Sequence, residues 1–102
     1  MKKTINGIRY DTTTAIRIGF YWNGLGDEDQ RDWSAYLYKT PRSGRFFLSG
    51  MGGPMTRFAR SAGDMNSVGE AIFPMSEEEA IAWSEQFIDS DEPEWTRITK
   101  TP

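Results

Sequence analysis

Apolar and polar residues alternate along several stretches of this chain, which is the pattern of half-buried β-strands. The run IRIGF, from Ile16 to Phe20, alternates in this way and predicts a strand over residues 15–22. The threonine-rich segment before it is open to two interpretations. Either Asp11 or Thr12 caps a short helical turn, or the β-branched residues continue the strand.

Asn6 and Gly7 separate two short β-rich segments, Lys3–Ile5 and Ile8–Tyr10. Asn-Gly is the strongest two-residue signal for a type I′ turn, in which both central residues need a positive φ. The segment therefore predicts a small β-hairpin near the start of the chain.

A second hairpin is predicted around the sequence PRSG at residues 41–44. Proline at the second position of a turn, followed by glycine, favours a tight connection. The two arms, Trp33–Thr40 and Arg45–Gly50, are rich in aromatic and other β-forming residues.

The residues after this hairpin give weaker signals. Residues 56–62 are interpreted as a short helix, because Pro54 stands near its first turn. Residues 63–69 are expected to be a loop, and residues 70–75 a short strand that ends at Pro74.

A helix over residues 76–89 carries the clearest signal in the chain. Ser76 is followed three residues later by Glu79, which is a capping box, and the acidic first turn suits the helix dipole. The acidic residues that follow are expected to end the helix. The face expected to pack on the sheet consists of Ala80, Ile81, Ser84, Phe87 and Ile88, of which Ile81, Phe87 and Ile88 should be buried.

These elements together predict an α+β fold, a small antiparallel β-sheet of hairpins with one C-terminal helix packed across it. A chain of 102 residues forms a single domain, here over residues 1–102, with 90–102 as a tail or a last short strand. Fourteen aromatic residues supply large side chains for a modest core.

The chain contains no cysteine and no histidine. It therefore lacks disulfides, thiolate metal sites, the commonest general base and the usual partner of a serine nucleophile. These absences favour a protein that is not an enzyme and needs no cofactor. With no apolar run of about 20 residues and no signal-peptide pattern, we expect a cytoplasmic protein with no membrane partner.

The net charge of −3 is unevenly distributed. Residues 33–63 contain five basic residues and no acidic one, whereas residues 64–102 contain ten acidic residues and two basic ones. Either the two regions present faces of opposite charge to partners, or the basic middle packs against the acidic part inside the fold.

Three glycines, Gly50, Gly52 and Gly53, lie between the second hairpin and Pro54. A phosphate-binding loop would need a lysine directly after the glycines or the spacing G-x-G-x-x-G before a helix, and the sequence has neither. We therefore expect these glycines to let the chain leave the strand at φ angles that other residues avoid.

Two charged sets are candidates for binding a partner. Arginines interleaved with aromatics suit single-stranded nucleic acid, although a pI near 4.9 opposes general nucleic-acid binding. Carboxylates could hold a metal, act as a catalytic pair or imitate the phosphates of nucleic acid, but solvated helix ends are the simpler interpretation. The candidate partner-binding residues are Arg42, Arg45, Arg57, Arg60, Glu77, Glu78, Glu79, Asp89, Asp91 and Glu92.

Three stretches, INGIRYDTTTA at 5–15, WSAYLYKTPRSGRFFLSGMGGPMTRFA at 33–59 and PMSEEEAIAWSEQ at 74–86, resemble a family of small proteins carried by phages and other mobile elements of bacteria. That family has an INGKRYDTxTA opening, an LYRTxxGxFFLxGEGG hairpin and an IxPLSxEEAxxW helix. The sequence departs from this pattern at Met51, where the family often has glutamate, and at residues 20–22, which replace a more polar stretch.

The resemblance implies an accessory protein of a mobile element, and some similar small proteins are anti-CRISPR inhibitors. It carries over no catalytic residue, because the shared motifs are structural. The favoured hypothesis is a phage-encoded anti-CRISPR protein that blocks a host Cas effector in the bacterial cytoplasm by direct stoichiometric binding, with no affinity for free nucleic acid at physiological salt. The alternatives are a nucleic-acid-binding or regulatory module that uses residues 39–60, and a hydrolase or transferase that uses carboxylates with serine or tyrosine.

Overall fold

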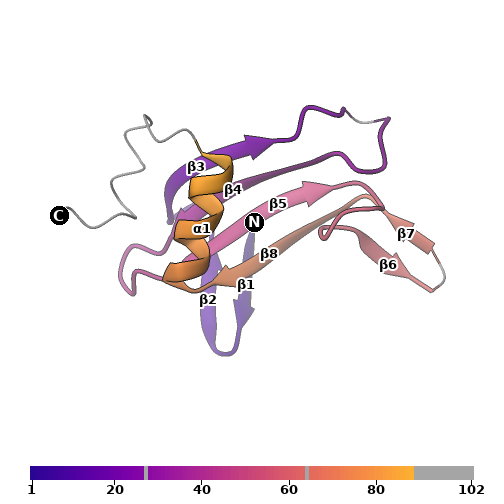
Figure 1. Cartoon of the computed structure of the whole chain (residues 1–102). Coiled ribbons are helices and arrows are strands. Elements are labelled where there is room, and N and C mark those ends of the chain that lie inside the picture. The colour runs from indigo at the N-terminus through magenta and orange to yellow at the C-terminus, as the bar shows by residue number, and fades with distance from the viewer. Residues whose placement is uncertain (27, 64, 89–102) are drawn as a thin grey trace.

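The computed structural model describes residues 1–26, 28–63 and 65–88, and it has the α+β fold that the sequence pattern predicts. The elements are β1 (Lys2–Ile5), β2 (Ile8–Asp11), β3 (Ile16–Trp22), β4 (Trp33–Lys39), β5 (Phe46–Gly52), β6 (Arg60–Ala62), β7 (Met65–Ser67), β8 (Gly69–Met75) and α1 (Glu77–Phe87). A four-stranded antiparallel sheet has the order β3-β4-β5-β8, while β1–β2 and β6–β7 form separate hairpins (Figure 1).

Helix α1 crosses one face of the four-stranded sheet, and the β1–β2 hairpin lies behind the opposite face (Figure 1). Successive side chains of a strand point to opposite faces, and β5 follows this rule. Phe46 and Leu48 belong to the core under the helix, whereas Phe47 belongs to the cluster under the hairpin. Because all three side chains are buried, β5 contributes to both cores.

The capping box at the start of α1 is confirmed. The Glu79 backbone N–H donates to the Ser76 hydroxyl oxygen at 3.1 Å, and the Ser76 N–H donates to the Glu79 carboxylate at 3.0 Å. The helix ends where the Ile88 N–H donates to the Ser84 carbonyl oxygen at 2.9 Å. The expected end at residue 89 lies outside the described residues.

The predicted face of α1 packs on the core. Ala80, Ser84 and Ile88 are buried, whereas Ile81 and Phe87 pack against the same core but are only partly buried, so full burial was wrong for these two residues. Trp83, which the sequence analysis left out, has only 8% of its surface exposed. Trp83 lies about one helical turn after the buried Ala80, so these two side chains share a face of the helix. Ile81 directly follows Ala80 and therefore points about 100° away from it around the helix axis.

The first hairpin has the predicted turn, since Asn6 has φ 52° and Gly7 has φ 78°. Its Tyr10 ring packs edge-on against Phe47, with ring centroids 5.3 Å apart, and Ile72 completes this second core. The threonine-rich segment after β2 forms a turn, and β3 begins only at Ile16. The strand interpretation of that segment is therefore wrong.

The second hairpin is also confirmed, with β4 and β5 paired along their whole length. The Thr40 N–H donates to the Arg45 carbonyl oxygen at 2.8 Å across the connection, and Gly44 takes a positive φ of 65°. The PRSG sequence therefore forms a four-residue connection between the paired residues Thr40 and Arg45, and its last residue, Gly44, supplies the positive φ.

The predictions for residues 56–70 are partly wrong. Arg60–Ala62 is a strand, and it pairs with Met65–Ser67 inside the segment expected to be a loop. At Gly69 a Cβ atom would collide with the backbone of Phe58, Ala59 and Arg60, so the backbones lie side by side there. This tertiary contact favours an extended conformation that local propensity does not predict.

Strand β8 matches the expected strand over residues 70–75 except that it begins one residue earlier, at Gly69, and Pro74 lies within it. It is an edge strand of the sheet. An edge strand tolerates proline, because the backbone N–H that proline lacks is not needed on the open side.

Candidate functional site

The loop at residues 53–59 folds back onto the sheet because glycine permits a close approach. Gly50, Gly52 and Gly53 all lack a positive φ, so the expected reason for their presence is wrong. A Cβ atom on Gly53 would lie 2.5 Å from the Gln30 carbonyl oxygen, and one on Gly50 would lie 2.7 Å from the Phe58 ring. The glycines therefore make room for packing.

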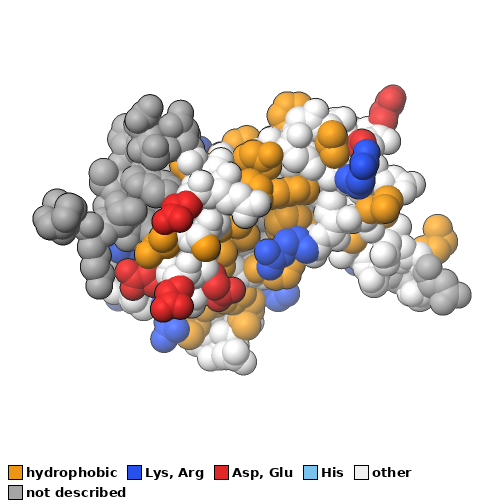
Figure 2. Space-filling view, in the orientation of Figure 1, with side chains coloured by type: hydrophobic (Ala, Val, Ile, Leu, Met, Phe, Trp, Pro, Cys, Tyr) orange, Lys and Arg blue, Asp and Glu red, His pale blue; other side chains and the backbone are white. Residues whose placement is uncertain are grey.

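This loop and helix α1 enclose a groove on the helix side of the sheet, with a volume of about 580 Å³. We call it the helix-side groove. Its walls include four aromatic residues, Trp33, Phe58, Trp83 and Phe87, and two arginines, Arg31 and Arg57, also line it. In Figure 2, hydrophobic side chains fill the band between the helix and the loops to its right, and basic side chains border that band.

The aromatic walls contact one another and are thereby held in place. Trp33 and Phe87 meet edge to face, with ring centroids 5.2 Å apart and planes at 87°. Trp83 lies 5.1 Å from Phe87, and Phe58 lies 6.0 Å from Trp33. Such ring pairs add about 0.5–1.5 kcal/mol each beyond simple burial, so the walls form a preformed surface.

The two arginines of the groove differ in their electrostatic partners. Arg31 forms an ion pair with Asp29 at 3.2 Å, and hydrogen bonds from Arg31 hold the pKa of Asp29 below its ordinary value. The guanidinium of Arg57 instead lies over the ring of Phe73, 4.2 Å from its centroid. Arg57 lines the groove, and no carboxylate of the described residues lies within 4.0 Å of it.

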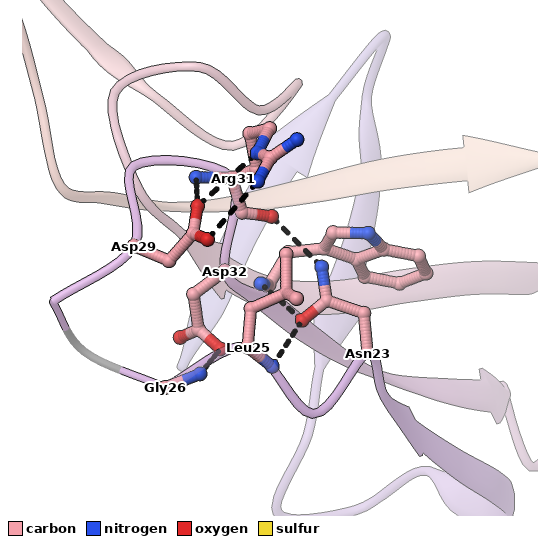
Figure 3. Close-up of polar contacts among 7 residues, drawn as sticks. Asn23, Leu25, Gly26, Asp29, Arg31 and Asp32 are labelled. Carbon is pink, nitrogen blue, oxygen red and sulfur yellow. Dashed lines mark hydrogen bonds and ion pairs between the residues drawn. The ribbon is translucent and has the colours of Figure 1, made fainter.

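The loop at residues 23–32 positions the opposite rim of the groove. Asn23 donates through Nδ2 to the Arg31 carbonyl oxygen at 2.8 Å and accepts through Oδ1 from the N–H groups of Leu25 and Trp33 (Figure 3). Asp32 accepts from the Gly26 N–H at 2.9 Å. Asparagine and aspartate stand at the two ends of this segment in the sequence, and these residue types are typical of loops that bind their own backbone.

A second surface lies on the opposite face of the sheet, next to the β1–β2 hairpin, since Met1 and Thr12 line a pocket together with Tyr36. Arg17, Phe20, Trp22 and Tyr36 form what we call the sheet-face patch. Phe20 is 43% exposed and Trp22 is 52% exposed. The Phe20 and Tyr36 ring centroids are 4.6 Å apart, and the Arg17 guanidinium lies 5.6 Å from the Tyr36 centroid. The patch thus combines exposed aromatic rings with one cation.

The structure does not bring the four candidate arginines together. Arg42 and Arg45 lie at the turn between β4 and β5, whereas Arg57 and Arg60 follow the other end of β5. A strand of seven residues is about 20 Å long. The basic middle of the sequence is therefore split between two ends of the sheet, and only Arg57 lines the groove.

The described acidic candidates, Glu77, Glu78 and Glu79, occupy the first turn of α1 and are all exposed. Glu79 is engaged in the capping box. Asp89, Asp91 and Glu92 lie outside the described residues. No group of three or more potential metal-binding side chains lies together in residues 1–26, 28–63 and 65–88.

The described residues show no ion pair between the basic region, residues 33–63, and the acidic region, residues 64–102. In the described part of the chain, the ion pairs are Arg9–Asp11 and Arg31–Asp29, and both join residues that are close in sequence. Arg57 acts on Glu79 only at longer range, where it helps to lower the pKa of that carboxyl group after the hydrogen bonds from Ser76.

No protein-family model matches the chain, and no curated protein or solved structure matches it either. The resemblance to proteins of mobile elements therefore stays a prediction. Among the described helices, none has the length and apolar character needed to cross a membrane.

Proposed function

We propose that this protein is a non-enzymatic inhibitor that binds a bacterial Cas effector directly and stoichiometrically, with the sheet-face patch as its contact surface. The observation that supports a binding role is the exposure of Phe20 and Trp22 beside Tyr36 and Arg17. Exposed aromatic side chains that cluster on one surface are typical of sites that bind another protein.

The composition of the patch is that of a binding hot spot. Trp, Tyr and Arg are the residues most enriched where alanine substitution weakens protein complexes most. Burying apolar surface contributes about 25 cal/mol per Å². The patch also lies on β3 and β4, two paired strands of the central sheet, so little conformational freedom is lost when a partner binds.

The kind of partner comes from the resemblance to small proteins of phages, some of which inhibit Cas effectors. The absence of histidine and cysteine accords with a protein that blocks by occupancy, since such a mechanism needs no general base or nucleophile. The runner-up, a nucleic-acid-binding module of a mobile element, is less favoured because the arginines of residues 39–60 lie at two ends of the sheet.

A pulldown with the tagged protein from a CRISPR-bearing bacterium tests the proposal, followed by titration of the captured purified effector in a DNA-cleavage assay. Inhibition should reach completion near an equimolar ratio. Phe20→Ala should weaken binding by about 2 kcal/mol or more, the magnitude typical of a hot spot. Met65→Ala removes a side chain that is 74% exposed on β7, and it should leave binding unchanged.

Two outcomes would contradict this proposal. If substoichiometric amounts inhibited the effector fully, the protein would act by turnover and would be an enzyme. If Phe20→Ala bound as tightly as the wild type, the sheet-face patch would not be the contact surface.

A further inference from the structure

We propose that the helix-side groove is a binding site for a small organic anion with a flat ring system. The groove lies on the helix side of the sheet, whereas Phe20, Trp22 and Tyr36 of the sheet-face patch lie on the other side. This second site is therefore independent of the proposed inhibitor function, and either can fail without the other.

The size of the groove suits a small molecule. Its volume of about 580 Å³ falls within the 300–1,000 Å³ that is typical of ligand sites in proteins. A molecule of two or three fused or linked rings fits in such a space. The loop at residues 53–59, which forms one wall, packs closely on its surroundings through Gly50 and Gly53, so the cavity is preformed.

The walls favour a flat apolar body. Trp33 and Phe87 meet at 87°, so their rings present a face and an edge at an angle to each other. Met55, which is 67% exposed, adds aliphatic surface at the rim, while the fully buried Leu48 lies beneath the groove. Aromatic ligands stack on ring faces and contact ring edges, and a thioether such as that of methionine adapts to their outline.

The charge of the groove favours an anion. Among the residues that the structure describes, no aspartate or glutamate lines it, and the charge of Arg31 is offset by its ion pair with Asp29 at 3.2 Å. Arg57 is held over the Phe73 ring without a carboxylate partner in the part of the chain that the structure describes. The N–H groups of Arg57 lie in the plane of its guanidinium, so they can donate hydrogen bonds to a carboxylate, sulfonate or phosphate while the guanidinium stays over the Phe73 ring.

One further polar group is available for recognition. The side chains of Asn23 and Thr56 are used inside the protein, because Asn23 bonds to the backbone of the 23–32 loop and Thr56 donates to the Gly53 carbonyl oxygen at 2.9 Å. The Gln86 side chain is exposed and makes no hydrogen bond to the other described residues. Gln86 and Arg57 are therefore the two polar contacts expected for the ligand.

A single-stranded nucleic acid would use the same chemistry of rings and cations, but the observations favour a small ligand. Such strands need a continuous cationic track beside the stacking rings. Here Arg42 and Arg45 lie at the far end of β5 from Arg57, and the chain carries a net charge of −3.

The test compares two dyes of similar shape, the anion 1-anilinonaphthalene-8-sulfonate and its neutral analogue N-phenyl-1-naphthylamine, by fluorescence titration of the full chain. We expect saturable binding of the anionic dye at one site per protein. Arg57→Gln should weaken the anion about tenfold, the size expected for loss of a charge-assisted hydrogen bond, while the neutral dye changes by less than about twofold. Arg42→Gln, at the β4–β5 turn, is the matched control and should change neither affinity.

Met55→Glu provides a second variant that places a negative charge at an exposed position of the rim without touching Arg57. Met55→Gln removes the same aliphatic surface without adding charge, so Met55→Glu should weaken the anion more than Met55→Gln does, while the neutral dye responds equally to both variants. The proposal is overturned if the anionic dye does not saturate at one site, or if both dyes respond equally to Arg57→Gln. It is also overturned if an oligothymidylate of about ten residues displaces the dye at physiological salt, since the site would then belong to nucleic acid.

Discussion

The indole N–H of Trp22 donates a hydrogen bond of 2.6 Å to Oδ1 of Asp32, and it thereby joins the end of β3 to the residue before β4. The same oxygen accepts the Gly26 N–H at 2.9 Å. One carboxylate oxygen therefore closes the 23–32 loop. Because Trp22 belongs to the sheet-face patch, this contact also holds one exposed ring of that patch in position.

We predict that Asp32→Ala lowers the free energy of unfolding by about 1–2 kcal/mol, because two donors lose their acceptor in a partly buried loop. Asp32→Asn keeps an acceptor oxygen and should cost less. Urea denaturation measures both variants. Glu28→Ala is the control, since Glu28 is exposed in the same loop and takes part in no hydrogen bond with the other described residues. Equal stability of Asp32→Ala and the control would show that the carboxylate does not hold the loop.

Ser76→Ala should lower the free energy of unfolding by about 0.5–2 kcal/mol, because it removes the acceptor for the Glu79 N–H at the start of α1. Thermal and urea denaturation would detect this loss. Partner binding should persist at low temperature, since Ser76 lies in neither surface. Glu77→Ala leaves the capping box intact and serves as the comparison, and an unchanged melting temperature for Ser76→Ala would argue against a stabilising cap.

Acidification should weaken the wild-type protein more than a Glu79→Gln variant. The hydrogen bond from the Ser76 backbone, and then that with its side chain, holds the pKa of Glu79 below its ordinary value of 4.5. The charged carboxylate therefore stabilises the folded state fully above pH 4.5, and this contribution is lost as the pH falls through the lower pKa of the folded state.

The measurement is the free energy of unfolding of both proteins at neutral pH and at a pH below the folded-state pKa of Glu79. Asp11 and Asp29 also have lowered pKa values, from hydrogen bonds with Thr13 and Arg31, so both proteins should lose some stability. Glu78→Gln, on the same helical turn, should behave like the wild type. Parallel pH profiles for the wild type and Glu79→Gln would rule out this role of the carboxylate.

Free DNA and RNA should bind weakly or not at all at about 150 mM salt, where screening acts over about 8 Å. The net charge of −3 repels phosphates, and the separation of Arg42 and Arg45 from Arg57 and Arg60 leaves no continuous basic track. Fluorescence anisotropy with labelled single- and double-stranded oligonucleotides tests this. Micromolar or tighter binding that falls steeply with salt and is lost in an Arg57→Gln, Arg60→Gln double variant would favour the nucleic-acid-binding alternative.

Local chemistry accounts for the features that the sequence predicted correctly. Asn6-Gly7 specifies a turn through its own φ preferences, the spacing of Ser76 and Glu79 specifies a cap, and the β-rich run from Ile16 to Phe20 specifies a strand. Each of these signals depends on residues within a few positions of one another, so it can be recognised in the sequence without knowledge of the tertiary structure. The predicted alternation within that strand is wrong, because the register shifts between Arg17 and Gly19 and Phe20 lies on the face opposite Ile18. The sheet of hairpins with one helix followed from these local elements.

Contacts between distant residues decided the rest. The β6–β7 hairpin replaced an expected helix where the backbone of Gly69 meets that of residues 58–60, and Gly53 is needed because Gln30 lies against it. Arg57 was a candidate from sequence, but its place beside Trp83 and Phe87 depends on how the 53–59 loop folds over the sheet. Sequence alone determined which residues turn, cap and favour strands, whereas tertiary packing determined which aromatics remain exposed, because burial depends on which distant segments cover each face of the sheet.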